Sequence, residues 1–179
     1  MEVIVKKILD ETFKQLKIDS EYSNQLSNGF EWWPHKQRQK FTYTLIKSIS
    51  DGTDLCRIDY TTDVVRKIKA SDDKIHQLVS TLNMLSTTYN LIYLKNEKKI
   101  ICHTNLYLSP DNKSMISTLC KFTSIMQPIY LDTITEKIAQ LVEGEPDYSS
   151  KPSTNTRTEP DEMLSADFVF VNHEPISKW

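Results

Sequence analysis

The segment from Asn28 to Pro34 places the strongest constraint on how this chain folds. It reads Asn-Gly-Phe-Glu-Trp-Trp-Pro and holds two of the three tryptophans. Asn-Gly predicts a turn, the aromatic run predicts a strand, and Pro34 limits its hydrogen-bonded ladder. Because side chains alternate along a strand, Trp32 and Trp33 point to opposite faces of the sheet. A sheet with one buried face therefore takes one indole into its core and leaves the other for a helix, a loop or a partner.

Three segments show apolar residues at helical spacing. Residues 2–17 have apolar side chains every three or four positions, with lysines and carboxylates between them. Residues 72–86 follow Ser71, a favourable cap, and begin with two aspartates that suit the positive end of a helix dipole. Residues 113–143 repeat the helical spacing, and Pro128 inside them predicts a kink or a split. Each of these helices needs an apolar surface to cover.

Between the helices, apolar and polar residues alternate as they do in half-buried strands. Strands are predicted at 30–33, from 41 onward and from 55 to about 60, and a hairpin joins 89–94 to 100–108. The order is helix, three strands, helix, hairpin and long helix, and the connections are short. The fold prediction is therefore α+β, with a single antiparallel sheet of about five strands and helices packed mainly on one face.

Composition divides the chain into a domain, a linker and a tail. The domain is predicted to cover residues 1–144, because Gly144 ends the last helix. Residues 145–162 are rich in Pro, Ser, Thr and charge, which predicts a flexible linker. The tail, 163–179, is apolar and aromatic and contains four consecutive apolar residues, Phe168 to Val171. Exposed, these would promote aggregation, so we expect them to dock onto the domain or onto a neighbouring copy.

Charge and cysteine content point to a cytoplasmic protein. Lys plus Arg number 22 and Asp plus Glu number 24, and a net charge of −2 gives no overall field for nucleic acid or anionic membrane. The three cysteines are odd in number and lie in apolar segments, as reduced thiols of a cytosolic core do. The first residues lack a signal-peptide pattern, and no window approaches the roughly 20 apolar residues of a membrane span.

The residues that carry catalysis do not occur at catalytic spacings. The four histidines are far apart, and none forms a metal motif with cysteine or carboxylate. Three glycines are too few for phosphate-binding loops. Cys56 and His103 would form a pair only if their strands adjoin, whereas a buried cysteine and a solvated histidine are the commoner case. We predict no enzyme activity, no catalytic residue, no cofactor and no metal.

Partner binding is predicted at Trp32, Trp33, Arg38 and Tyr43, on the free face or edge of the sheet. Tryptophan, tyrosine and arginine are enriched at protein-binding hot spots, and a one-sided sheet does not bury both indoles in one core. The expected partner is a protein segment or a second copy of the chain, in a homodimer. An alternative is single-stranded nucleic acid held by the basic and aromatic segment 33–43. A third reading is that these cations lie on a solvated strand and discourage edge-to-edge aggregation.

The order of elements and several motifs resemble the bacterial YbjN-like family, whose fold is similar to type III secretion chaperones. The resembling motifs are Gly29-Phe30-Glu31-Trp32-Trp33-Pro34, Arg57 to Val65, Leu82-Asn83-Met84-Leu85 and the hairpin that leads into the long helix. The resemblance covers roughly residues 2–144 and includes no catalytic motif. It implies an α+β domain that binds proteins, as a chaperone or a regulatory module, often as a dimer. The linker and tail after residue 144 depart from it.

Overall fold

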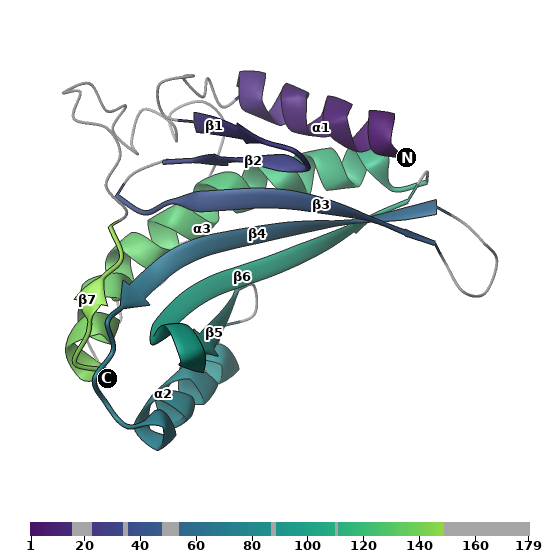
Figure 1. Ribbon diagram of the computed structural model, residues 1–179. Helices are drawn as coiled ribbons and strands as arrows, with labels where there is room; N and C mark the ends of the chain where they lie inside the picture. Colours follow the sequence, from purple (N-terminus) through teal and green to yellow (C-terminus); the bar gives the residue numbers. More distant parts are fainter. Residues whose placement is uncertain (16–22, 34–35, 48–53, 87–88, 110, 149–179) are drawn as a thin grey trace.

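An antiparallel sheet forms the centre of the molecule (Figure 1). The computed structural model describes residues 1–15, 23–33, 36–47, 54–86, 89–109 and 111–148. Six strands lie in the order β1-β2-β3-β4-β6-β5, and a seventh, β7, pairs with β4. Their bounds are β1 Ser23–Leu26, β2 Gly29–Trp32, β3 Gln39–Lys47, β4 Asp54–Arg66, β5 Asn90–Leu94, β6 Lys99–Leu108 and β7 Glu145–Pro146. The predicted α+β class with one antiparallel sheet is confirmed. The structure describes seven strands, more than the five or so that were predicted.

The helices are α1 Glu2–Gln15, α2 Asp72–Leu85 and α3 Lys113–Leu141, and a short 3-10 helix, Lys95–Glu97, joins β5 to β6. They confirm the predictions for 2–17, 72–86 and 113–143 within the residues that the structure describes. Figure 1 shows α3 passing behind the sheet, with α1 above it and α2 below. The helix α3 is continuous through Pro128, so the proline does not split it. Among the described residues no helix is long and apolar enough to cross a membrane.

The core between helices and sheet consists of two apolar clusters. One joins α1 and the first half of α3 to β2, β3 and β4, and contains Ile8, Phe41 and Ile116. The other joins α2 and the second half of α3 to β4, β5 and β6, and contains Ile75 and Leu131. The alternation of side chains places these strand residues on the face that the helices cover.

A buried polar seam of Gln39, Thr62 and Gln127 also lies between the sheet and α3. The amide nitrogen of Gln39 donates to the amide oxygen of Gln127 over 2.9 Å, and the Thr62 hydroxyl donates to that same oxygen over 2.7 Å. Trp32 completes the seam, because its indole N–H donates to the amide oxygen of Gln39 over 2.8 Å. Buried polar groups need such partners, so the seam fixes α3 in one register on the sheet.

The domain extends beyond residue 144, which corrects the predicted boundary. Glu145 and Pro146 form β7 and pair with Arg66 and Val65 at the end of β4. The strand β3 ends its pairing with β4 at Gln39, so β7 occupies the edge that β3 leaves open. The first four residues of the predicted linker therefore belong to the domain, and the rest of the linker, the tail 163–179 and Phe168 to Val171 lie outside the described residues.

Candidate functional site

Two of the predicted partner-binding residues, Trp32 and Tyr43, lie in the core. Their exposed fractions are 4% and 7%, and both belong to the cluster that contains Phe41. The Tyr43 hydroxyl donates to the Glu2 carboxylate of α1 over 3.4 Å. Alternation explains this position, because Tyr43 follows Phe41 by two residues on the same face of β3. The prediction that these two side chains contribute to an exposed surface is therefore corrected, whereas the prediction that one indole anchors the core is confirmed.

Trp33 and Arg38 lie nearer the surface. Trp33 follows β2 and is half-buried. Arg38 points to the sheet face opposite the helices, where its guanidinium contacts the Asp63 carboxylate at 2.8 Å and the Glu31 carboxylate at 3.4 Å. The structure therefore does not bring the four predicted residues together in one surface, and the cation among them is held between two carboxylates.

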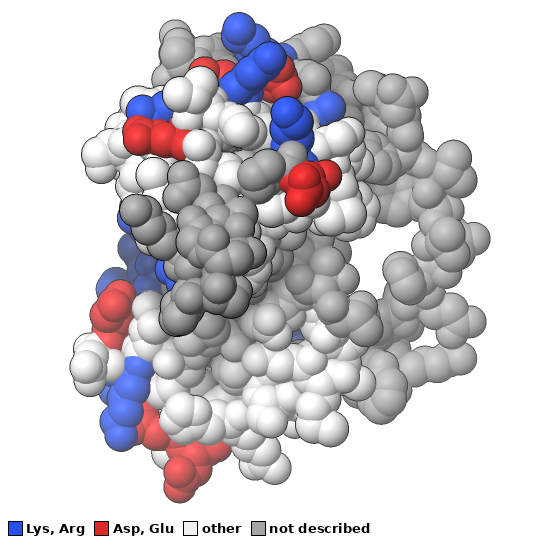
Figure 2. Space-filling view, turned by 90° about the vertical axis from the view of Figure 1, so that its right-hand side faces the viewer, with Lys and Arg blue, Asp and Glu red and all other residues white. Residues whose placement is uncertain are grey.

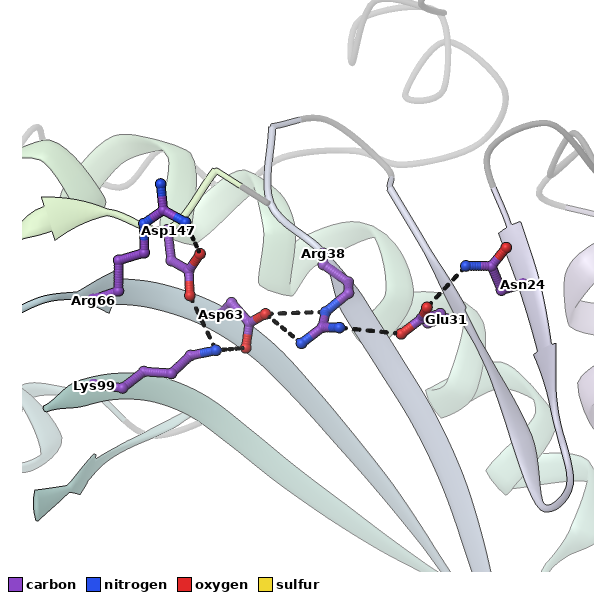
Figure 3. A network of polar contacts seen from close by, with 7 residues as sticks. All are labelled: Asn24, Glu31, Arg38, Asp63, Arg66, Lys99 and Asp147. Atoms are coloured by element: carbon purple, nitrogen blue, oxygen red, sulfur yellow. Dashed lines mark hydrogen bonds and ion pairs between the residues drawn. The ribbon is translucent and has the colours of Figure 1, made fainter. Parts of the chain in front are cut away.

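The contacts of Arg38 are part of a charged network across the open face of the sheet, in which Arg38 and Lys99 alternate with carboxylates (Figure 3). The Lys99 ammonium lies 2.7 Å from Asp63 and 3.0 Å from Asp147, and Arg66 lies 3.8 Å from Asp147. Burial acts to lower the pKa of Lys99, but hydrogen bonds to the two aspartates outweigh it, so the net pKa is raised. We define the charged network as Glu31, Arg38, Asp63, Arg66, Lys99 and Asp147.

The charged network also explains why the segment after β7 is held. Asp147 lies beyond β7, and its backbone N–H donates to the Val64 carbonyl over 2.9 Å. Its carboxylate is nearly buried and contacts Lys99 and Arg66. Tyr148 then donates to the Glu136 carboxylate of α3. The sequence did not predict this site, because its carboxylates lie far apart along the chain and only the topology brings them together.

Several cations of the described open face pair with its own carboxylates, whereas Lys40 of β3 is exposed on that face. Within the charged network three basic and three acidic side chains alternate, so their formal charges cancel. Nearby on the same face, Asp59 lies 2.8 Å from Arg57 and 3.0 Å from the His103 ring. A hydrogen bond to Asp59 raises the pKa of Arg57. Phosphate binding requires cations with charge to spare, and the paired cations of this face do not supply it.

The cysteines have the environment of inert core residues. Cys56, Cys102 and Cys120 are fully buried, and burial raises the pKa of their thiols to about 11, about 12 and about 11. Such thiols are protonated near neutral pH and are poor nucleophiles. Cys56 faces the helices, whereas His103 faces the open side of the sheet, so the two do not form a pair. Among the described residues no group of His, Cys, Asp or Glu has the geometry of a metal site.

Large apolar side chains are exposed on the helix side of the molecule. Along one flank of α3 they recur every three or four residues, at Met115, Leu119, Phe122, Met126 and Tyr130. Met115 has an exposed fraction of 57%, and the next four are half-buried. This spacing keeps them on one side of the helix, beside the stripe that packs on the sheet.

The helix α2 adds a second apolar stripe on the same side of the sheet as that of α3. Leu78, Leu82 and Leu85 share one flank of α2, and Leu85 has an exposed fraction of 62%. Leu78, Leu82 and Met126 pack against the same core cluster, so both stripes border that cluster. Leu106 of β6 faces the helices and is only half-buried. We define the apolar flank as a subset of these stripes together with the strand residue: Leu78, Leu82, Leu85, Leu106, Met115, Leu119 and Met126.

The distribution of charge agrees with this surface. Figure 2 looks at the side of the molecule where α3 begins, and it shows charged residues gathered at the top, over α1, and along the lower left edge. Among the described residues, a broad area of uncharged side chains lies at the lower centre and lower right of this view. The sequence identified these residues as apolar, but it did not reveal which of them the sheet leaves uncovered.

No family model, curated protein or solved structure matches this chain. The resemblance to the YbjN-like family therefore stays a prediction. Two surfaces bear on function, the open face of the sheet with its charged network and the apolar flank.

Proposed function

We propose that the chain is a non-catalytic protein-binding module, chaperone-like or regulatory, that binds an apolar protein segment on the apolar flank. The observation that carries the proposal is the exposure of Leu85 and Met115 on two helices that pack on the same side of the sheet, at 62% and 57%. Single exposed apolar residues are common on protein surfaces, but a contiguous uncharged area is typical of an interaction site.

The size of the apolar flank suits a protein segment. Fully burying a leucine or methionine side chain contributes about 1.5 to 3 kcal/mol, so covering Leu85 and Met115 supplies about 2 to 4 kcal/mol, since each is already part-covered. The half-buried Leu82, Leu119 and Met126 extend the contact area. Ordering and association costs oppose this gain, so we expect a modest affinity that favours exchange between partners.

Nucleic-acid binding is the alternative with less support. It needs the cations of segment 33–43, and Arg38 already contacts Asp63 and Glu31. An added phosphate would have to displace one of these carboxylates. The two functions are separable, because phosphate contacts weaken steeply as salt is raised and an apolar interface does not.

Capture of binding partners from the native host tests the proposal. Wild-type chain is compared with the double variant Leu85→Gln/Met115→Gln, which removes apolar surface while keeping a good helix former at each position. Met84→Gln is the matched control, because Met84 neighbours Leu85, is 84% exposed and lies on the opposite side of α2 from Leu82. Circular dichroism establishes that all variants fold.

The proposal predicts a partner protein that wild type and the Met84→Gln control retain at low and high salt and that the double variant loses. Retention of every partner by the double variant would contradict it. Recovery of nucleic acid alone, lost at high salt, would replace it with the alternative.

A further inference from the structure

We propose that the segment Phe168 to Val171 of the same chain covers the apolar flank, and that a protein partner displaces it. The displacement rests on the proposed function, and the covering does not. This segment is Phe-Val-Phe-Val, and the residues from 149 to 162 before it include no aliphatic or aromatic residue. The apolar flank is the matching surface, because Leu85 and Met115 expose large apolar side chains on the helix side of the sheet.

The position of Tyr148 puts the apolar flank within reach of this segment. Tyr148 is the last described residue, and it is held against α3 by Glu136, with the Lys36 ammonium 5.4 Å from its ring. Glu136 and Met126 lie about 15 Å apart along the helix axis, at 1.5 Å per residue. Phe168 follows Tyr148 by 20 residues, and a chain of that length spans at most about 66 Å when fully extended. The segment therefore reaches Met126 without strain.

Attachment to the same chain strengthens a weak contact. A short tether gives a local concentration on the order of millimolar, so even a short apolar segment occupies the surface for much of the time. The same segment of a second copy is present at a lower concentration, so it competes poorly for the apolar flank. Tethering therefore favours the segment of the same chain over that of a neighbour.

Disulfide trapping in the full-length chain tests the covering. The pair Leu85→Cys with Phe170→Cys places one thiol on the apolar flank and one in the segment. The pair Met84→Cys with Phe170→Cys is the control, because Met84 lies next to Leu85 in the chain but points away from Leu82 and the stripe of α2. The native thiols stay in place, since all three are buried and burial raises their pKa.

We expect the Leu85 pair to form an intramolecular disulfide about tenfold faster than the Met84 pair under mild oxidation, as the difference in effective concentration requires. The product should run as a monomer on a non-reducing gel. Equal rates for the two pairs would overturn the inference. Disulfide-linked dimers as the main product would also overturn it, because the segment of a second copy would then cover the surface.

A second variant separates this inference from the proposed function. Phe168→Ser/Phe170→Ser in the full chain removes the covering segment, so capture of the partner should rise relative to wild type. If Leu85→Gln/Met115→Gln abolishes capture but the Leu85 disulfide forms no faster than its control, the inference fails and the proposed function stands. If the disulfide forms as expected and capture is unaffected by the flank variant, the covering is supported and the proposed function fails.

Discussion

Replacing Gln127 with leucine should destabilise the chain strongly, because Gln127 accepts two hydrogen bonds inside the polar seam. Its amide oxygen takes one from Gln39 at 2.9 Å and one from the Thr62 hydroxyl at 2.7 Å, and all three residues are fully buried. A buried donor left without a partner costs about 1 to 3 kcal/mol, so two of them cost about 2 to 6 kcal/mol. Gln39 keeps a marginal contact with Thr62 at 3.5 Å, which favours the lower half of that range.

Urea unfolding followed by circular dichroism measures this loss. Gln140→Leu is the matched control, because Gln140 lies on the exposed side of the same helix and should change the free energy of unfolding by at most about 0.5 kcal/mol. Adding Thr62→Val to Gln127→Leu removes a donor together with its acceptor, so the double variant should lose less than the sum of the two single losses. An unfolding free energy for Gln127→Leu within about 0.5 kcal/mol of wild type would refute the account of the polar seam.

Three further predictions concern single positions. Gly29→Ala should destabilise the chain by about 1 to 3 kcal/mol or more in the same urea assay, because a Cβ would lie 2.0 Å from the Phe41 carbonyl oxygen at a φ of +157°; wild-type stability would contradict this. Hydrogen bonds from Lys95, Lys98 and Tyr93 lower the pKa of Asp72, so its contribution is present above the ordinary carboxyl pKa of 3.8 and is lost as the pH falls through the lowered value. The stability difference between wild type and Asp72→Asn should therefore shrink on acidification. A stability difference that grows as the pH falls would contradict this prediction. The three thiols should resist a thiol reagent in the folded chain and all react in denaturant, and fast labelling of the folded chain would show that they are not buried as described.

Helical periodicity predicted α1, α2 and α3 well, because each has a long apolar stripe and the spacing persists over several turns. The strands β1 and β7 were missed, since Ser-Asn-Gln-Leu and Glu-Pro carry little apolar alternation. The strand β7 forms because β3 leaves the last part of β4 unpaired on that edge. Long-range pairing of this kind is set by topology, which local pattern does not specify.

The candidate site, like the fold, could be predicted only in part from the sequence. The alternation that predicted a strand through Phe41 also places Tyr43 on the core face, so a signal against Tyr43 as a surface residue was present in the sequence. Which indole enters the core depends on the pairing of Trp32 with Gln39, and this register was not predictable from the segment alone. The apolar flank was hidden for a different reason, because a helix with a wide apolar stripe does not reveal how much of it the sheet covers.

Photo-crosslinking in the native host tests the central claim most directly, namely that partners bind the apolar flank and not the open face of the sheet. A photoreactive phenylalanine derivative replaces Leu85 in one variant and Lys40, an exposed residue of β3 on the open face, in the other. The account predicts protein adducts from position 85 that position 40 does not give. Adducts formed only from position 40, or equally from both, would contradict it.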